Sequence, residues 1–178
     1  KPAIHTEFNI EGYPSKKFLE IIRDIRPAQA TLVPDPPNAL TSNAGWDTIR
    51  HFDFLKDVIA QINSYGVRAS LFVGTEPEKI FKAAELGSQR IELYTEPYAT
   101  EFPDNPQTAV APFVAAAKAA IEAGLGINAG HDLSLQNLKY FAQQVPGLLE
   151  VSIGHALISD ALYFGLENTI QMYLRQLQ

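Results

Sequence analysis

The sequence of 178 residues contains no cysteine, and it has no apolar run long enough to cross a membrane. The absence of cysteine excludes disulfide bonds and thiolate metal sites, so the compartment we expect is a reducing cytoplasm. A membrane-spanning helix needs about 20 consecutive apolar residues, so no membrane interaction of that kind is expected. These absences favour a cytoplasmic protein.

Positive charge is also scarce, because 14 lysines and arginines stand against 20 aspartates and glutamates, for a net charge of −6. A chain of this charge has no general surface for neutralising phosphates, which disfavours nucleic acid as a partner. A local anion site built from backbone amides remains possible. Hydrophobic residues make up 46% of the chain and charged residues 19%, which predicts one globular domain over residues 1–178.

Short apolar runs alternate with longer helical patterns along the whole chain. Strands are expected over 3–10, 29–34, 68–74, 90–96, 126–131 and 149–155, and helices over 15–25, 51–66, 76–87, 106–124, 134–145 and 159–178, the last in two pieces around Gly165. Strict alternation of this kind predicts a parallel sheet with crossover helices.

Two α/β architectures fit this alternation: an open, doubly wound sheet, and a (β/α)₈ TIM barrel. No Gly-rich dinucleotide fingerprint follows any strand, which disfavours the first. Polar residues end several successive strands, as on the catalytic rim of a barrel. A barrel has eight units in about 250 residues, and this sequence supplies about six. Either the sheet is open, or two N-terminal units are missing from the sequence.

Two glutamates interrupt apolar strand runs, and both are candidates for acid–base chemistry. Glu7 lies in "AIHTEFNI" and Glu92 in "RIELYTE". A carboxylate inside a parallel strand is costly to bury unless it is paired or hydrogen-bonded. The alternative for each is to reach a wet rim or to accept a hydrogen bond from a neighbouring arginine. A barrel interior would bring the two together and raise a pKa towards the acid–base range.

The dipeptide Gly-His ends two short apolar runs, in "NAGH" and "SIGH". Glycine lets the backbone approach a ligand, and histidine titrates near neutral pH. His155 also opens a stretch that leads into a helix, which is the arrangement of a phosphate cradle. The alternatives are that His131 and His155 only cap turns, or that they join the glutamates around Zn²⁺ or Fe²⁺. No metal-binding spacing supports the last alternative.

The longest irregular stretch, residues 33–47, follows the end of a strand, where loops are often functional. Thr41 and Ser42 within it are suited either to donate to a phosphate or hydroxyl, or to stabilise a turn. Trp46, the only tryptophan, is expected to pack the loop against the body of the domain.

Taken together, these segments resemble the pyridoxine 5′-phosphate synthase family of vitamin B6 biosynthesis. The resemblance runs in order along the chain and is carried by "TEFNIEGYPSKKFLEII", "QATLVPDPPNALTSNAGWD", "RASLFV", "RIELYTEPYA", "GINAGHDLSLQNL" and "EVSIGHALISDALYFGLE". It implies a TIM barrel that condenses 1-deoxy-D-xylulose 5-phosphate with 3-amino-2-oxopropyl phosphate, releasing phosphate and water. It also implies a homo-octamer that uses no metal or organic cofactor.

The resemblance assigns three catalytic roles. Glu7 matches the general base, Glu92 the carboxylate that stabilises charged intermediates, and His131 the proton donor. Repeated proton transfers at one place suit carboxylates and a histidine that hold different pKa values.

The resemblance assigns binding roles as well. Gly154 and His155 match a segment that binds substrate phosphate, and Thr41 matches a substrate-contacting hydroxyl. Asp132 stands at a substrate-binding position that is glycine in some relatives, so a contact there through the backbone would survive the change.

Two rival functions remain open from the residues alone: another cofactor-free TIM-barrel enzyme acting on phosphorylated sugars, and a non-catalytic phosphate-binding protein. An aldolase would need a Schiff-base lysine, and no predicted strand carries one in its interior. The family begins with two βα units that nothing in residues 1–178 matches. We therefore expect a protein that truly starts at Lys1 to turn over no substrate and to expose an apolar sheet edge.

Overall fold

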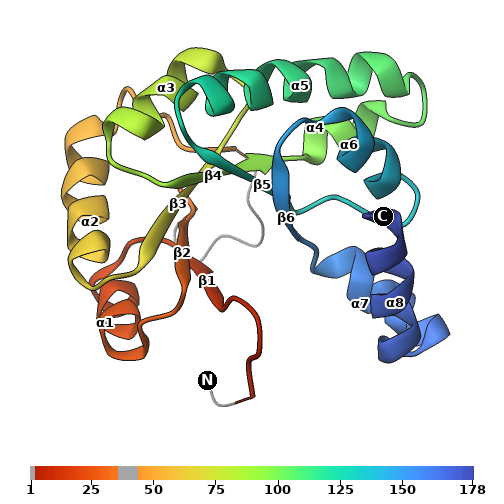
Figure 1. The fold of residues 1–178 in the computed structure, drawn as a ribbon, viewed down its shortest axis with the longest axis horizontal. Helices are drawn as coiled ribbons and strands as arrows, with labels where there is room; N and C mark the ends of the chain where they lie inside the picture. Colours follow the sequence, from red (N-terminus) through yellow and green to blue (C-terminus); the bar gives the residue numbers. More distant parts are fainter. Residues whose placement is uncertain (1–2, 36–43) are drawn as a thin grey trace.

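The computed structural model describes residues 3–35 and 44–178, which form six strands and eight helices (Figure 1). None of these helices is long and apolar enough to cross a membrane. The elements are β1 (Asn9–Gly12), α1 (Lys16–Ile25), β2 (Gln29–Leu32), α2 (Phe52–Ser64), β3 (Arg68–Val73), α3 (Pro77–Glu85), β4 (Arg90–Tyr94), α4 (Glu96–Glu101), α5 (Pro106–Glu122), β5 (Gly126–Gly130), α6 (Leu138–Gln144), β6 (Leu148–Ser152), α7 (His155–Phe164) and α8 (Leu166–Gln176).

All six strands are parallel and stand in the sheet in their sequence order, from β1 to β6. A doubly wound sheet reverses its order at a switch point, whereas a TIM barrel adds each strand beside the previous one. The sheet curls, and helices α1, α2, α3, α5 and α6 surround its outer side (Figure 1). The structure therefore confirms the predicted barrel architecture, with six of its units.

Local signals in the sequence explain several of the element boundaries. The Ser15 hydroxyl accepts from the Phe18 backbone N–H at 3.2 Å and so caps the start of α1. Gly165, with φ of 79°, separates α7 from α8 as expected, because a left-handed residue interrupts a helix at low cost only when it is glycine.

Several boundaries differ from those expected from the sequence; α6, for example, begins at Leu138 instead of 134, and β6 ends at Ser152 instead of 155. The first strand covers Asn9–Gly12 instead of 3–10, α7 begins at His155 instead of 159, and α4 follows β4 without having been predicted. The N-terminal Gly154–His155 start of α7 lacks a side-chain cap, so the usual sequence signal for a helix start is missing there.

The two faces of the sheet differ sharply in polarity. The outer face supplies apolar side chains that pack against the helices, such as Leu71, Ile91 and Ala129. Side chains alternate between the faces along a strand, so the intervening residues lie on the inner face. This inner face carries Asn9, Glu11, Gln29, Thr31, Ser70, Arg90, Glu92, Asn128, Glu150 and Ser152. Most of the apolar core therefore lies outside the sheet, and the inner face is mostly polar, with Phe72 and Tyr94 as its aromatic members.

Trp46 anchors the end of the long loop to the sheet, as expected. Its indole N–H donates to the Leu32 carbonyl at 3.0 Å, and its backbone N–H donates to the Phe72 carbonyl at 2.8 Å. The preceding residue must be small, because a Cβ on Gly45 would lie 2.4 Å from the backbone of Val73. Glycine at position 45 thus allows the loop to lie directly on the end of β3.

This contact predicts that Gly45→Ala destabilises the protein by about 2 kcal/mol, since backbone atoms cannot move aside for the new methyl group. Urea denaturation followed by Trp46 fluorescence measures the effect. Gly154→Ala is the control, because a Cβ at Gly154 meets no atom within 4 Å. Equal stability of Gly45→Ala and the unsubstituted protein would contradict the described packing.

Candidate active site

A cavity of about 350 Å³ opens on the inner face of the half-barrel, towards the carboxyl ends of the strands. Two carboxyl groups, Glu11 and Glu92, share it with two imidazoles, His131 and His155. The remaining lining residues are Ser152, Ile153 and Gly154. Acids, bases and the start of a helix thus meet in one place, although they come from β1, β4, β5, β6 and α7.

Glu92 is the most deeply buried titratable side chain of this cavity, with 1% of its surface exposed. Burial raises its pKa to about 8, and the negative charges of Glu11 and Glu150 contribute to the rise. Hydrogen bonds with Ser152 and Thr31 act in the opposite direction. One oxygen, Oε2, is buried without a hydrogen-bond partner in the described part of the chain. Glu92 is therefore a neutral acid at pH 7, able to donate a proton to a ligand.

Gly130 owes its identity to Glu92 and to the backbone of β6. A Cβ at position 130 would lie 2.4 Å from Glu92 Oε1 and 2.8 Å from the Ser152 carbonyl oxygen. Gly130 is paired with Tyr94 on β4 and with Ser152 on β6. The short distance to Oε1 means that the Glu92 carboxyl group lies over the β5 backbone at Gly130. The glycine of the first Gly-His dipeptide makes room for the buried acid.

Glu11 is the site residue that the sequence analysis missed. It is the penultimate residue of β1, and its side chain keeps contact with solvent at the open edge of the sheet. The surrounding protein nevertheless desolvates the carboxyl group in part and raises its pKa, an effect that Asp35 strengthens and His131 opposes. Its signal in the sequence is a carboxylate just before the Gly-Tyr-Pro-Ser turn that leads into α1.

Glu7 does not reach this cavity, so the expected meeting of Glu7 with Glu92 and His131 does not occur. It precedes β1 at the amino end of the sheet, where Arg68 Nη1 donates to its Oε1 at 3.3 Å and Arg68 Nη2 forms an ion pair with its Oε2. The hydrogen bond from Arg68 lowers its pKa. Glu7 thus follows the alternative given from the sequence, in which the carboxylate accepts from a neighbouring arginine instead of joining the site. The misplacement follows from the expected strand, which ended at residue 10 instead of at Gly12.

His131 is held in an unusual backbone conformation with φ of 97°, which non-glycine residues rarely adopt and which is frequent at functional sites. Its backbone N–H donates to the Ser152 carbonyl at 3.0 Å. Nδ1 lies 2.9 Å from Asp132 Oδ2, which favours the tautomer with the proton on Nδ1. Asp132 therefore orients the imidazole, and its side chain is not among those that line the cavity.

Gly154 and His155 lie at the start of α7, on the wall of the same cavity. The first amides of this ten-residue helix have no partner within the helix, so they suit an anion. The His155 ring lies 6.4 Å from the His131 ring, centroid to centroid. Unlike Gly130, Gly154 is not required by packing, since a Cβ there meets nothing within 4 Å.

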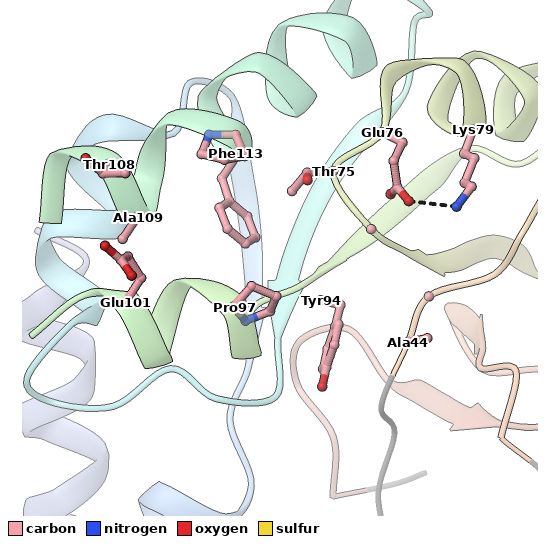
Figure 2. Close-up of a pocket in the computed structure, with 13 residues that line it drawn as sticks. Ala44, Thr75, Glu76, Lys79, Tyr94, Pro97, Glu101, Thr108, Ala109 and Phe113 are labelled. Atoms are coloured by element: carbon pink, nitrogen blue, oxygen red, sulfur yellow. Dashed lines mark hydrogen bonds and ion pairs between the residues drawn. The ribbon is translucent and has the colours of Figure 1, made fainter. Parts of the chain in front are cut away.

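A second cavity, of about 410 Å³, lies next to the first between the end of β4 and helices α3, α4 and α5 (Figure 2). Tyr94 connects the two, because it lines the second cavity and its ring stands edge-on to His131 at 6.0 Å. Glu76 and Lys79 form an ion pair of 2.7 Å in its wall (Figure 2). That pair lowers the pKa of Glu76 and raises that of Lys79, so both remain charged and the proton-exchanging groups belong to the first cavity.

Thr41, expected to contact substrate, lies outside the described residues. Among residues 3–35 and 44–178, no group of three or more histidine, aspartate or glutamate side chains is arranged to hold a metal ion.

The sequence matches known proteins along its whole length. The model of the family described as "Pyridoxal phosphate biosynthesis protein PdxJ" matches residues 1–178. The "Pyridoxine 5'-phosphate synthase" of Bacteroides thetaiotaomicron is 59% identical over 173 residues, which cover 97% of this chain and 73% of that protein. The protein of the same name from Christiangramia forsetii is 57% identical over 178 residues, 100% of this chain and 75% of its own. The chain thus spans about three quarters of the length of these relatives.

Solved structures support the fold independently of sequence. The citrate synthase SbnG superposes with a TM-score of 0.57 at 16% identity, over 97% of this chain and 73% of its own. A xylose isomerase domain protein from Planctomyces limnophilus gives 0.59 at 10% identity, over 99% and 73%. At these identities the similarity concerns the fold alone.

The raised pKa of Glu92 predicts how stability depends on pH. In the folded protein Glu92 keeps its proton up to about pH 8, and in the unfolded chain only up to its ordinary value of 4.5. Its contribution to stability is thus complete below pH 4.5 and is lost as the pH rises towards 8. Glu92→Gln, which stays neutral, should gain stability relative to the unsubstituted protein across this window, by a few kcal/mol at about 1.4 kcal/mol per pH unit.

Urea denaturation at a series of pH values measures that gain. Glu7→Gln is the control, because the pKa of Glu7 is lowered and its removal should give no gain in the same window. A stability difference between Glu92→Gln and the unsubstituted protein that does not change with pH would contradict the assignment of a neutral buried acid.

Proposed function

The chain belongs to the family of pyridoxal phosphate biosynthesis protein PdxJ, and from this membership we propose that its inner cavity is the acid–base centre of a pyridoxine 5′-phosphate synthase. The observation that carries the proposal is the meeting of Glu11, Glu92 and His131 in one cavity whose wall includes the start of α7. The reaction is the condensation of 1-deoxy-D-xylulose 5-phosphate with 3-amino-2-oxopropyl phosphate, with release of phosphate and water.

Ring closure of this kind requires several proton transfers between carbon, nitrogen and oxygen atoms held in one place. We assign the general base to Glu11, in place of Glu7, because Glu11 lies in the cavity and keeps contact with solvent. A base that exchanges its proton with water can act repeatedly in one reaction cycle. The raised pKa of its carboxyl brings it closer to neutral pH, where a general base is most effective.

Glu92 and His131 are assigned complementary roles. Glu92 is neutral at pH 7 and buried, so it can donate a hydrogen bond to a developing negative charge or transfer a proton to a leaving hydroxyl. The His131 ring lines the cavity and Asp132 holds its Nδ1, which suits the imidazole to donate a proton and recover it. Side chains serve each of these steps, and the proposal needs no metal or organic cofactor.

The phosphate of one substrate is assigned to the start of α7. The free amides there and the positive end of the helix dipole favour an anion, and His155 adds a donor beside them. A phosphate bound at this point would hold the substrate carbon skeleton over Glu92 and His131. Remote binding of this kind supplies orientation for the chemical steps. Thr41 is proposed to contact substrate through its hydroxyl, as the family resemblance implies.

Location and assembly follow the family as well. We propose a cytoplasmic homo-octamer, in line with a chain that contains no cysteine. Leu162 and Tyr163 on α7 expose 82% and 84% of their surfaces, and apolar side chains this exposed support an assembled state in which another surface covers them.

A pair of matched substitutions tests the proposal in the intact protein that contains this sequence. Glu11→Gln should lower kcat by a factor of about 10² to 10⁴, as expected for loss of a general base. Glu7→Gln removes the same charge at the opposite end of the sheet and should keep kcat within about twofold, because it breaks only an exposed ion pair. Formation of pyridoxine 5′-phosphate and release of phosphate from the two substrates measure both.

The opposite pattern, with Glu7→Gln inactive and Glu11→Gln active, would return the base to Glu7 and refute the assignment. Full activity of both variants would remove acid–base catalysis from β1 altogether.

A further inference from the structure

Beneath the cavity, on the amino side of Glu92, three polar residues of the inner face form a closed cluster: Arg90, Asn128 and Glu150. Arg90 Nη1 donates to Asn128 Oδ1 at 2.9 Å and to Glu150 Oε2 at 3.1 Å, and Asn128 Nδ2 donates to the same Glu150 oxygen at 3.3 Å. Asn128 is fully buried, and the side chains of Arg90 and Glu150 expose only 16% and 28% of their surfaces. None of the three lines the cavity.

The register of the sheet fixes this cluster against Glu92. Glu92 on β4 pairs with Asn128 on β5, and Asn128 pairs with Glu150 on β6. Paired residues of a parallel sheet point to the same face, and neighbouring strands are about 4.8 Å apart. Two carboxyl groups therefore stand in one row on either side of a single amide.

Arg90 lies on the same strand and face as Glu92, two residues earlier. Its Nη1 forms an ion pair of 3.1 Å with Glu150, and removal of either partner would leave an uncompensated charge in a partly buried place. The carboxylate of Glu150 thus stands in the row that contains Glu92, and its charge raises the pKa of Glu92. Asn128, the neutral residue between them, accepts from Arg90 and donates to Glu150 and so fixes the distance.

The groups around Glu92 are of two kinds: partners that hydrogen-bond its carboxyl group, and charged or titratable side chains on the neighbouring elements. Ser152 and Thr31 form hydrogen bonds with its carboxyl group, and Oε2 has no partner among the residues that the structure describes. The neighbouring elements contribute the following titratable or charged side chains: Glu11 from β1, Arg68 from β3, Arg90 from β4, His131 from the end of β5 and Glu150 from β6. Arg68 donates hydrogen bonds to Glu7 and Gln29. The anions whose charges raise the pKa of Glu92 are Glu11 and Glu150.

We propose that Arg90, Asn128 and Glu150 form a positioning group that holds a carboxylate in the row of Glu92 and so keeps the proton of Glu92 in place for the reaction above. The part that concerns the reaction rests on the proposed function, whereas the effect of the cluster on Glu92 does not. The cluster touches no ligand. It acts through Glu92, because a carboxyl group flanked by two anions loses its proton less readily than one beside neutral groups.

Titration of the Glu92 carboxyl carbon by NMR, in the ¹³C-glutamate-labelled intact protein that contains this sequence, tests this without any turnover. Loss of the signal in Glu92→Gln assigns it. Glu150→Gln, which is nearly isosteric, should move the midpoint to lower pH by about one pH unit, because one of two flanking anions is removed. Glu122→Gln removes the same charge from the outer surface of α5 and should leave the Glu92 midpoint where it is.

Asn128→Asp provides the opposite change and guards against an effect of general disruption. It places a new anion directly beside Glu92 and should move the midpoint to higher pH. Arg90→Lys, which keeps the positive charge, should leave the midpoint closer to that of the unsubstituted chain than Arg90→Gln does. Shifts of opposite sign in Glu150→Gln and Asn128→Asp support the proposal, and a midpoint that Glu150→Gln leaves unmoved overturns it.

The two proposals fail separately in this design. A chain without synthase activity whose Glu92 midpoint responds as described retains the positioning group and loses the proposed reaction. An active synthase whose midpoint does not respond to Glu150→Gln retains the reaction and loses the positioning group.

Discussion

The burial of one neutral carboxyl group, that of Glu92, is the constraint on which the rest of the site depends. Burial of an ionised carboxylate in this position would cost much free energy of hydration, so the Glu92 carboxyl group keeps its proton. The carboxyl group needs space over β5, which only glycine at position 130 provides. It also needs polar partners on the inner face, which Thr31 and Ser152 supply. Sequence choices on four strands therefore follow from a single buried acid.

Such an interior is possible because the stabilising core lies elsewhere. The outer face of the sheet and the helices around it bury a continuous apolar cluster, in which Leu71, Ile91 and Phe141 have no exposed surface. Typical barrels fill their interior with branched apolar side chains. Here the helix-facing layer carries the hydrophobic stabilisation, and the inner face is free to hold charged and hydrogen-bonding groups at the cost of some stability.

Much of this organisation can be predicted from sequence, because it depends on local patterns. The alternation of apolar runs and amphipathic segments predicts the parallel sheet, and Ser15 and Gly165 mark a helix start and a helix break that the structure confirms. The choice between Glu7 and Glu11 could not be made in this way. It depends on where β1 begins and ends, because the four residues from Glu7 to Glu11 span the distance between the two ends of this short strand. The cluster of Arg90, Asn128 and Glu150 was equally hidden, since it exists only through the register of three strands.

The two Gly-His dipeptides show why a repeated motif need not have a repeated cause. At the end of β5 the glycine is imposed by the Glu92 carboxyl group together with the Ser152 carbonyl of β6, and the positive φ falls on His131 itself. At the start of α7 nothing packs against the position of the missing Cβ, and the glycine leaves the helix amides open to the cavity. The first dipeptide therefore places a histidine beside a buried acid, and the second prepares a surface for an anion. Their convergence on one cavity follows from the barrel, which brings the carboxyl ends of distant strands to a common rim.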